Sequence, residues 1–231
     1  RQGCGQCGPC MKGHPWFCHG HQMTTELFRI PGCHTRLNGE RCIQTCSGTS
    51  GFAEYCNAHE SMLCKLDDDI PFEIGSALAC GFMSGFGAVL NRCQVRPGES
   101  FAVCGCGGVG RMIAIEAVRA GADLTISVPK EFRDTVDPVI EYAKKNNCSG
   151  KITVICPDNA ENVLDNAEGD FDLLINASPV GMFPKVDACP VSEDVIARCG
   201  FVFDVIYNPE ETKLIRTAKA HGIKTLGGMA M

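Results

Sequence analysis

The chain has 231 residues, of which 45% are hydrophobic and 21% are charged, and its formal net charge at pH 7 is −6. This composition is typical of a globular protein with one large or two modest domains. No basic stripe is present to neutralise phosphates, so we expect no nucleic-acid partner. The most hydrophobic stretch, residues 77–90, is interrupted by glycine and serine and is shorter than the roughly 18 apolar residues that a bilayer span needs. We therefore expect no membrane association.

Four cysteines open the chain with the spacing C-x2-C-x2-C-x7-C: Cys4, Cys7, Cys10 and Cys18. Zinc accepts a tetrahedron of thiolates, and the short gaps let the chain curl round one ion while glycines and a proline supply tight turns. The spacing predicts a closed structural zinc site. We expect a loop-rich, zinc-stapled lobe over residues 1–75.

The other cysteines need a different explanation, because the chain holds 17 in all. No export signal is visible and the thiols are clustered, so a reducing cytoplasm fits better than a disulfide framework. Outside the first four, the cysteines in apolar segments are interpreted as small hydrophobic residues. These include Cys93, Cys104, Cys148, Cys156 and Cys199.

From residue 71 onward the pattern changes to alternating helices and strands. Residues 72–93 read as an apolar helix, and Val109, Met112, Ile113 and Ala117 recur at helical spacing. Short apolar segments typical of strands fall at residues 100–104, 124–128, 151–156, 171–176, 201–206 and 223–226. This alternation predicts an α/β, Rossmann-type, doubly wound parallel sheet over residues 76–231.

Between the last two strands, residues 208–211 (Asn-Pro-Glu-Glu) have the composition of a helix start, with a cap, a proline and two carboxylates. In sheets of this kind, ligands bind outside the carboxyl ends of the strands. We therefore expect the chemistry to gather in the loops after residues 104, 128, 176, 206 and 226.

A glycine-rich turn, G-x-G-x-x-G, lies directly after the first expected strand and opens a helix. Such glycines permit a tight turn, admit a pyrophosphate and let the helix pack closely on the sheet. The second strand ends without the acidic residue that would hold the ribose of NAD, whereas Lys130 and Arg133 are placed to face the 2′-phosphate of NADP. These two cations favour NADP over NAD as the cofactor. The alternative is that both side chains are solvated and bind no phosphate. The turn comprises Gly105, Cys106, Gly107, Gly108, Val109 and Gly110.

The first half of the chain resembles the zinc-dependent, medium-chain alcohol dehydrogenases over residues 1–110. The resemblance rests on the four-cysteine loop and on the segments 51–55, 80–88 and 95–99. It implies that Cys80 matches one ligand of a catalytic zinc, which polarises the alcohol oxygen and keeps an open position. It also implies a homodimer that pairs through a sheet edge.

The second half is similar to shikimate dehydrogenases over residues 104–231. The matching motifs are Asn-Ala-Ser-Pro-Val-Gly-Met at 176–182, Asp-Val-Ile-Tyr-Asn-Pro at 204–209, Thr-Lys-Leu at 212–214 and Gly-Met-Ala-Met at 228–231. This resemblance implies that Asn176, Val205 and Gly228 line the cofactor and that Tyr207 reaches the substrate. The general acid and base of that family have no match here, so no catalytic residue is assigned.

Both families transfer a hydride between an alcohol and a nicotinamide cofactor. The expected function is therefore that of an NAD(P)-dependent oxidoreductase acting on a CH-OH group of a small alcohol or carbonyl substrate. The alternative is a zinc- and nucleotide-binding fragment or fusion without turnover, because the catalytic set is unfinished. A third possible function, that of a thiol-based redox sensor, is supported only by the number of cysteines.

Overall fold

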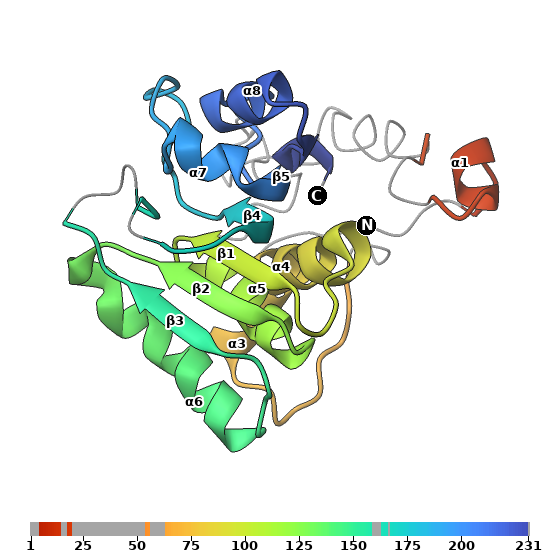
Figure 1. Ribbon diagram of the computed structural model, residues 1–231. Coiled ribbons are helices and arrows are strands. Elements are labelled where there is room, and N and C mark those ends of the chain that lie inside the picture. Colours follow the sequence, from red (N-terminus) through yellow and green to blue (C-terminus); the bar gives the residue numbers. More distant parts are fainter. Residues whose placement is uncertain are drawn as a thin grey trace. The chain divides into compact units, whose positions relative to one another are not determined.

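The computed structural model describes residues 5–14, 18–19, 54–55, 63–158, 163–165 and 167–230. The chain divides into two units, Arg1–Asp69 and Ile70–Met231, which are coloured along the sequence in Figure 1. In the described part of the first unit, a short helix, α1 (Gly8–Met11), carries Cys10 and is preceded by Cys7 at its N-cap.

The second unit is built on a six-stranded sheet in which every paired strand runs parallel to its neighbour (Figure 1). The order is β3-β2-β1-β4-β5-β6, so the chain reverses direction across the sheet between β1 and β4. The predicted doubly wound parallel sheet is confirmed, and the strand bounds differ from the expected ones by two residues at most. The strands are β1 (Ser100–Cys104), β2 (Asp123–Ser127), β3 (Ile152–Ile155), β4 (Phe171–Asn176), β5 (Cys199–Asp204) and β6 (Lys224–Leu226).

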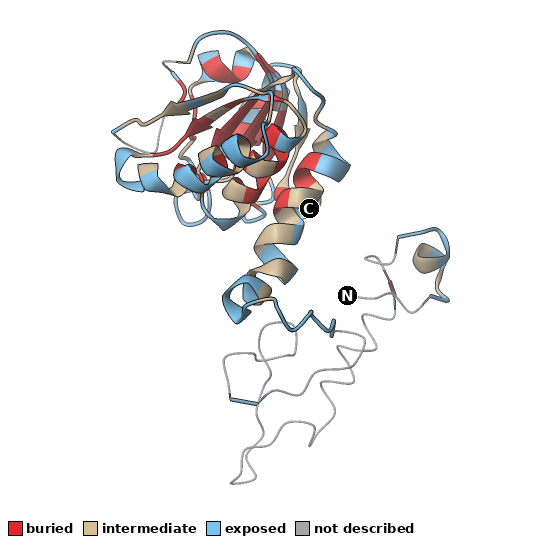
Figure 2. Ribbon diagram, turned by 90° about the horizontal axis from the view of Figure 1, so that it is seen from below, coloured by how far each residue is buried: buried red, intermediate tan, exposed pale blue. Residues whose placement is uncertain are grey.

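Helices cover both faces of the sheet, and alternate strand residues enter two separate cores. On one face, α5 (Gly108–Arg119) and α6 (Asp137–Lys145) pack with Phe101 and Val103. On the other, α7 (Glu193–Ala197) and α8 (Lys213–Ala220) pack with Ala102 and Cys104. This is why the strands read as continuous apolar runs rather than as alternating ones. In Figure 2 the buried residues concentrate along the strands and the inner faces of the helices.

Two of the predicted apolar cysteines, Cys104 and Cys199, lie in the core. Burial raises the pKa of the Cys104 thiol, and it raises the pKa of Cys199 and of the half-buried Cys93 to about 12. Such thiols stay protonated at neutral pH and act as small hydrophobic side chains.

The predicted helix over residues 72–93 is present as four consecutive segments: α3 (Phe72–Ala77), the π-helix η4 (Leu78–Phe82), α4 (Met83–Gly87) and the π-helix η5 (Ala88–Cys93). Contrary to the expectation from hydropathy, its length and composition would allow it to cross a membrane. That feature is weak evidence, because helices in the cores of soluble proteins satisfy the same criteria. Its second half packs against α5, where Gly85, Ala88 and Val89 are buried.

One predicted helix start is wrong. The helix after β5 begins at Lys213 rather than at residues 208–211, and its N-cap is Thr212, whose hydroxyl accepts a hydrogen bond from the N–H of Ile215. The carbonyl of Asn208 instead accepts a hydrogen bond from the N–H of Phe183 in the loop after β4. A tertiary contact therefore holds this segment outside the helix, although its composition matches a local start signal.

Candidate functional site

The carboxyl ends of β1 and β4 meet where the strand order reverses. At this point the N–H of Ala177 donates to the carbonyl of Cys104, and the N–H of Gly105 donates to the carbonyl of Ser127 at the end of β2. Such a reversal is where ligands bind in open α/β sheets. The glycine turn therefore lies at the end of the sheet where a ligand is expected.

The glycines of the turn fall into two groups. Gly105 has a φ of +91°, and a Cβ there would lie 3.0 Å from the carbonyl oxygen of Ala177. A Cβ at Gly110 would lie 2.3 Å from the carbonyl oxygen of Gly105. At Gly107 and Gly108, by contrast, a Cβ would meet no atom of the described part of the chain within 4 Å. Packing explains the first pair, but it does not explain why the second pair lacks side chains.

Just beyond β2, the two predicted cations are each paired with a carboxylate. The ammonium of Lys130 lies 2.5 Å from a carboxylate oxygen of Asp158, which follows β3. The guanidinium of Arg133 lies 2.8 Å from a carboxylate oxygen of Asp137. Sequence reasoning missed Asp158 because it is 28 positions away and reaches Lys130 through strand pairing.

Asn176, which was expected to line the cofactor, is fully buried and its side chain is saturated with internal hydrogen bonds. Its amide nitrogen donates to the carbonyl of Val180 at 3.1 Å and to a carboxylate oxygen of Asp204 at 3.2 Å. Its side-chain oxygen accepts from the N–H and the hydroxyl of Ser178. The Asn176 side chain therefore shapes the loop after β4.

Asp204, at the end of β5, is the centre of this polar network and was missed as a functional residue. Besides the contact with Asn176, its carboxylate accepts from the N–H of Ile206 at 3.0 Å and from the hydroxyl of Thr212 at 2.6 Å. Desolvation raises the pKa of Asp204 to about 6, although these three hydrogen bonds favour the charged form. One buried carboxylate thus connects the loops after β4 and β5 with the start of α8.

The titration of Asp204 predicts a pH dependence of stability. Because its pKa rises from 3.8 to about 6 on folding, its stabilising contribution is fully present below pH 3.8 and is lost as the pH rises through 6. We expect the free energy of unfolding of the wild type, minus that of Asp204→Asn, to fall by at most about 3 kcal/mol between pH 4 and pH 7. Urea unfolding at several pH values measures this difference, and a constant value would contradict the shift.

Tyr207, Val205 and Gly228 lie at the carboxyl ends of β5 and β6. Tyr207 is 68% exposed, so its side chain is accessible to a ligand. The N–H of Gly228 donates to the carbonyl of Ile206, and a Cβ at Gly228 would lie 2.3 Å from the carbonyl oxygen of Val205. This contact holds Gly228 against the loop that carries Tyr207.

Arg111, on α5 directly after the glycine turn, also went unnoticed in the sequence. Among the described residues its Nε is buried and has no hydrogen-bond partner. Burial raises the pKa of the neighbouring Cys106 thiol, and the charge of Arg111 opposes this rise. Cys106 itself donates to the carbonyl of Thr135 and is 3% exposed, so it is a core residue of the turn.

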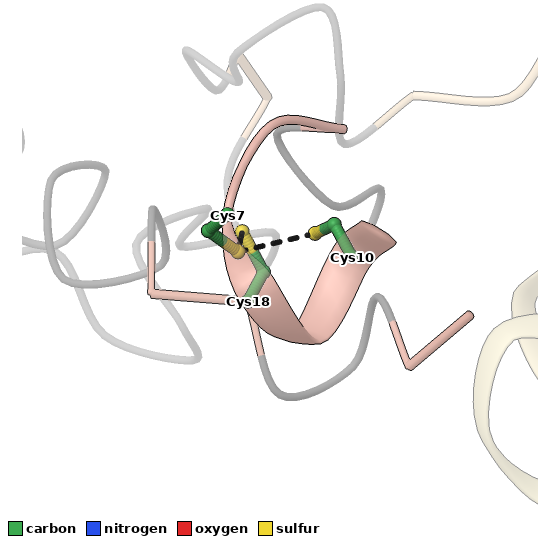
Figure 3. A group of neighbouring side chains, drawn as sticks. All are labelled: Cys7, Cys10 and Cys18. Carbon is green, nitrogen blue, oxygen red and sulfur yellow. Dashed lines mark hydrogen bonds between the residues drawn. The ribbon is translucent and has the colours of Figure 1, made fainter. Parts of the chain in front are cut away.

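In the first unit, three of the four predicted zinc ligands lie together (Figure 3). The Sγ atom of Cys7 is 3.4 Å from that of Cys10 and 3.8 Å from that of Cys18, and all three lie within 4.8 Å of one another. A tetrahedral zinc with Zn–S bonds near 2.3 Å places its sulfurs about 3.8 Å apart, so the cluster fits this ion. Cys4 lies outside the described residues.

Cys80, the fifth predicted metal ligand, belongs to the second unit. It is exposed on η4, one residue before Gly81, whose Cβ would lie 3.8 Å from the carbonyl carbon of Gly108. The residue that follows Cys80 in the chain thus lies close to the glycine turn. Among the described residues, the group suited to hold a metal is Cys7, Cys10 and Cys18, and it does not include Cys80.

No protein-family model matches the chain. It is 35% identical over 147 residues to shikimate dehydrogenase (NADP+) of Methanosarcina barkeri, covering 62% of this chain and 49% of that protein. It is 29% identical over 235 residues to alcohol dehydrogenase 6 of Peromyscus maniculatus, covering 97% of this chain and 52% of that protein. The chain thus spans about half the length of these curated relatives.

Solved structures of both kinds are similar to this one. A shikimate dehydrogenase in complex with NADP+ has a TM-score of 0.50 and 26% identity, covering 64% of this chain and 50% of that one. An alcohol dehydrogenase zinc-binding domain protein from Burkholderia ambifaria has a TM-score of 0.61 over 97% of this chain and 60% of that one; at 22% identity it shows the fold alone. The predicted double resemblance is confirmed.

Proposed function

We propose that the chain is an NAD(P)-dependent oxidoreductase that transfers a hydride between a CH-OH group of a small alcohol and a nicotinamide cofactor. The observation that carries the proposal is the open space beside Gly107 and Gly108. The fold requires Gly105 and Gly110, whereas no described residue fills the space where side chains at Gly107 and Gly108 would lie. A ligand that approaches the backbone closely accounts for both.

The residues of the turn suit a pyrophosphate. The N–H groups in the first turn of α5 have no acceptor within the helix, and they lie at the positive end of its dipole. These groups would hold the pyrophosphate, while the nicotinamide, when bound, exchanges the hydride with the alcohol carbon. The buried hydrogen bonds of Asn176 and Asp204 would hold the loops after β4 and β5 in place, and Tyr207 would contact the substrate.

We further propose that Cys7, Cys10 and Cys18, with Cys4, hold a structural zinc. Cys7 and Cys10 are three residues apart at the start of α1, so the first helical turn brings both thiols to one side. Bound zinc would stabilise the fold of a segment in which few residues can form an apolar core.

Cys7→Ser should reduce the zinc content of the purified chain from one ion to less than about a tenth, because a hydroxyl replaces a thiolate ligand. Mass spectrometric metal analysis after dialysis against a weak chelator measures this content. The matched control is Cys64→Ser, which replaces an exposed free thiol and should leave the zinc in place. Equal zinc content in the two variants would contradict the site.

We also propose that the protein works in a reducing cytoplasm. Two cysteines in the described part of the chain support this location, because the thiols of Cys64 and Cys80 are exposed and form no disulfide. In an oxidising compartment such thiols tend to be paired.

A binding module without turnover is the second candidate, and the polar network favours it. Asp204 is an ionisable group at the carboxyl ends of β4 and β5, but its carboxylate is buried and fully engaged by hydrogen bonds. The folded chain therefore keeps this carboxylate out of contact with a substrate, so turnover needs a base from another residue.

Cofactor reduction by the purified chain separates the two candidates. NAD or NADP is incubated with primary alcohols, secondary alcohols or shikimate, and the absorbance of the reduced nicotinamide is followed. Turnover with any of these substrates supports the oxidoreductase. Binding of a cofactor without turnover favours the module, and failure to bind either cofactor overturns both.

A further inference from the structure

The end of β2 is where a dinucleotide-binding sheet recognises the adenosine ribose, and here its last residue cannot do so. Ser127 is buried, and its hydroxyl donates to the carbonyl of Val163 at 2.8 Å. The next residue, Val128, is buried and has no polar side-chain atom. A ribose bound at this end of the sheet would therefore have to contact residues other than these two.

The backbone beyond β2 and β3 places Lys130 and Asp158 side by side. The N–H of Val128 donates to the carbonyl of Ile155, and the N–H of Lys130 donates to the carbonyl of Pro157. These bonds extend the pairing of the two strands and bring the Lys130 ammonium to the Asp158 carboxylate. Both side chains are largely exposed, at 67% and 84%, so a ligand at this end of the sheet can reach either.

We propose that the Lys130–Asp158 pair sets the choice between the two nicotinamide dinucleotides, with Lys130 binding the 2′-phosphate of NADP and Asp158 weakening that binding. The inference rests on the proposed function, because it places the adenosine ribose beyond β2. It assigns cofactor selectivity to a carboxylate that follows β3 rather than to a residue at the end of β2.

Electrostatics gives the two residues opposite effects. An exposed ion pair contributes little to stability, so a phosphate can compete with Asp158 for the ammonium. The carboxylate then lies close to a phosphate of like charge, which disfavours NADP. NAD carries a neutral hydroxyl at this position, so it meets no such repulsion.

Isothermal titration with NADP and NAD, on the full chain and three variants, tests the assignment. We expect Asp158→Asn to tighten NADP binding about tenfold and Lys130→Met to weaken it about tenfold, with less than about a twofold effect on NAD. The matched control is Glu193→Gln, which removes from α7 an exposed carboxylate that is paired with His221, on the face of the sheet opposite α6. It should leave the ratio of the two affinities unchanged.

The outcomes separate this inference from the proposed function. If the wild type binds neither dinucleotide, the proposed function fails. If it binds them and Asp158→Asn keeps the wild-type ratio of affinities, the selectivity assignment alone is wrong. Weaker NAD binding with unchanged NADP binding in Asp158→Asn also overturns it, because Asp158 would then hold the ribose of NAD without opposing the phosphate.

Discussion

Replacing Gly107 with valine is expected to weaken dinucleotide binding by at least about 100-fold, which corresponds to about 2.7 kcal/mol. The side chain would occupy the open space beside the start of α5, where the pyrophosphate is proposed to lie. The backbone of Gly107 is extended, with a φ of −73° and a ψ of −163°, so valine fits there without strain. Titration calorimetry of wild type and variant with NADP measures the loss.

Stability measurements distinguish a loss of dinucleotide binding from a loss of folding in the Gly107→Val variant. Among the described residues, a Cβ at Gly107 would meet no atom within 4 Å. We therefore expect the free energy of unfolding of Gly107→Val to stay within about 1 kcal/mol of the wild type, the scale of an N-cap change. Gly110→Ala is the contrasting variant, since its Cβ would collide with the carbonyl of Gly105 and should cost stability as well as binding. Undiminished affinity in a folded Gly107→Val chain would refute the assigned pyrophosphate position.

Gly85→Ala should have the largest effect on stability among the glycine variants of the helix over residues 72–93. Its Cβ would lie 2.4 Å from the Cβ of Met112 on α5, and a Cβ cannot move away by changing rotamer. The two helices must separate, so we expect a loss of about 2–3 kcal/mol, the cost typical of an overpacked core. In a unit of this size that loss lowers the melting temperature by about 5–10 °C, which calorimetry can measure.

Gly81→Ala is the matched control, because it makes the same substitution in the same helix. Its Cβ would lie 3.8 Å from the carbonyl carbon of Gly108, which is an ordinary contact. Alanine is about 1 kcal/mol more favourable than glycine in a helix, so this variant should be as stable as the wild type or more stable. Equal losses in both variants would show that the close approach of α4 to α5 is not the cause.

The sequence alone was sufficient to predict the parallel sheet and the position of the glycine turn. Most of the strands are short, mainly apolar segments between polar loops, and the turn follows the first strand directly. The start of α8 was not predictable in this way. Residues 208–211 carry the local signal, but hydrogen bonds from Phe183 to Asn208 and from Thr212 to Asp204 decide where the helix begins.

The candidate site was predictable to a lesser degree, because its polar contacts join residues that are far apart in the chain. Lys130 was identified from its place after β2, whereas Asp158 comes beside it through the pairing of β2 with β3. Asn176 was identified from its motif, whereas its hydrogen bond to Asp204 joins it to a residue 28 positions away. Sequence spacing indicates which strand end a residue follows, but it does not indicate which groups that residue contacts.

The buried contact between Asp204, Asn176 and Thr212 has a consequence for how the loops open. Each partner belongs to a different segment, yet all share a single carboxylate that water does not reach. Opening the loop after β5 would take the shared carboxylate away from both Asn176 and Thr212, so the three segments should unfold locally as one cooperative unit. Amide hydrogen exchange should therefore show linked protection of the loop after β4, the loop after β5 and the first turn of α8.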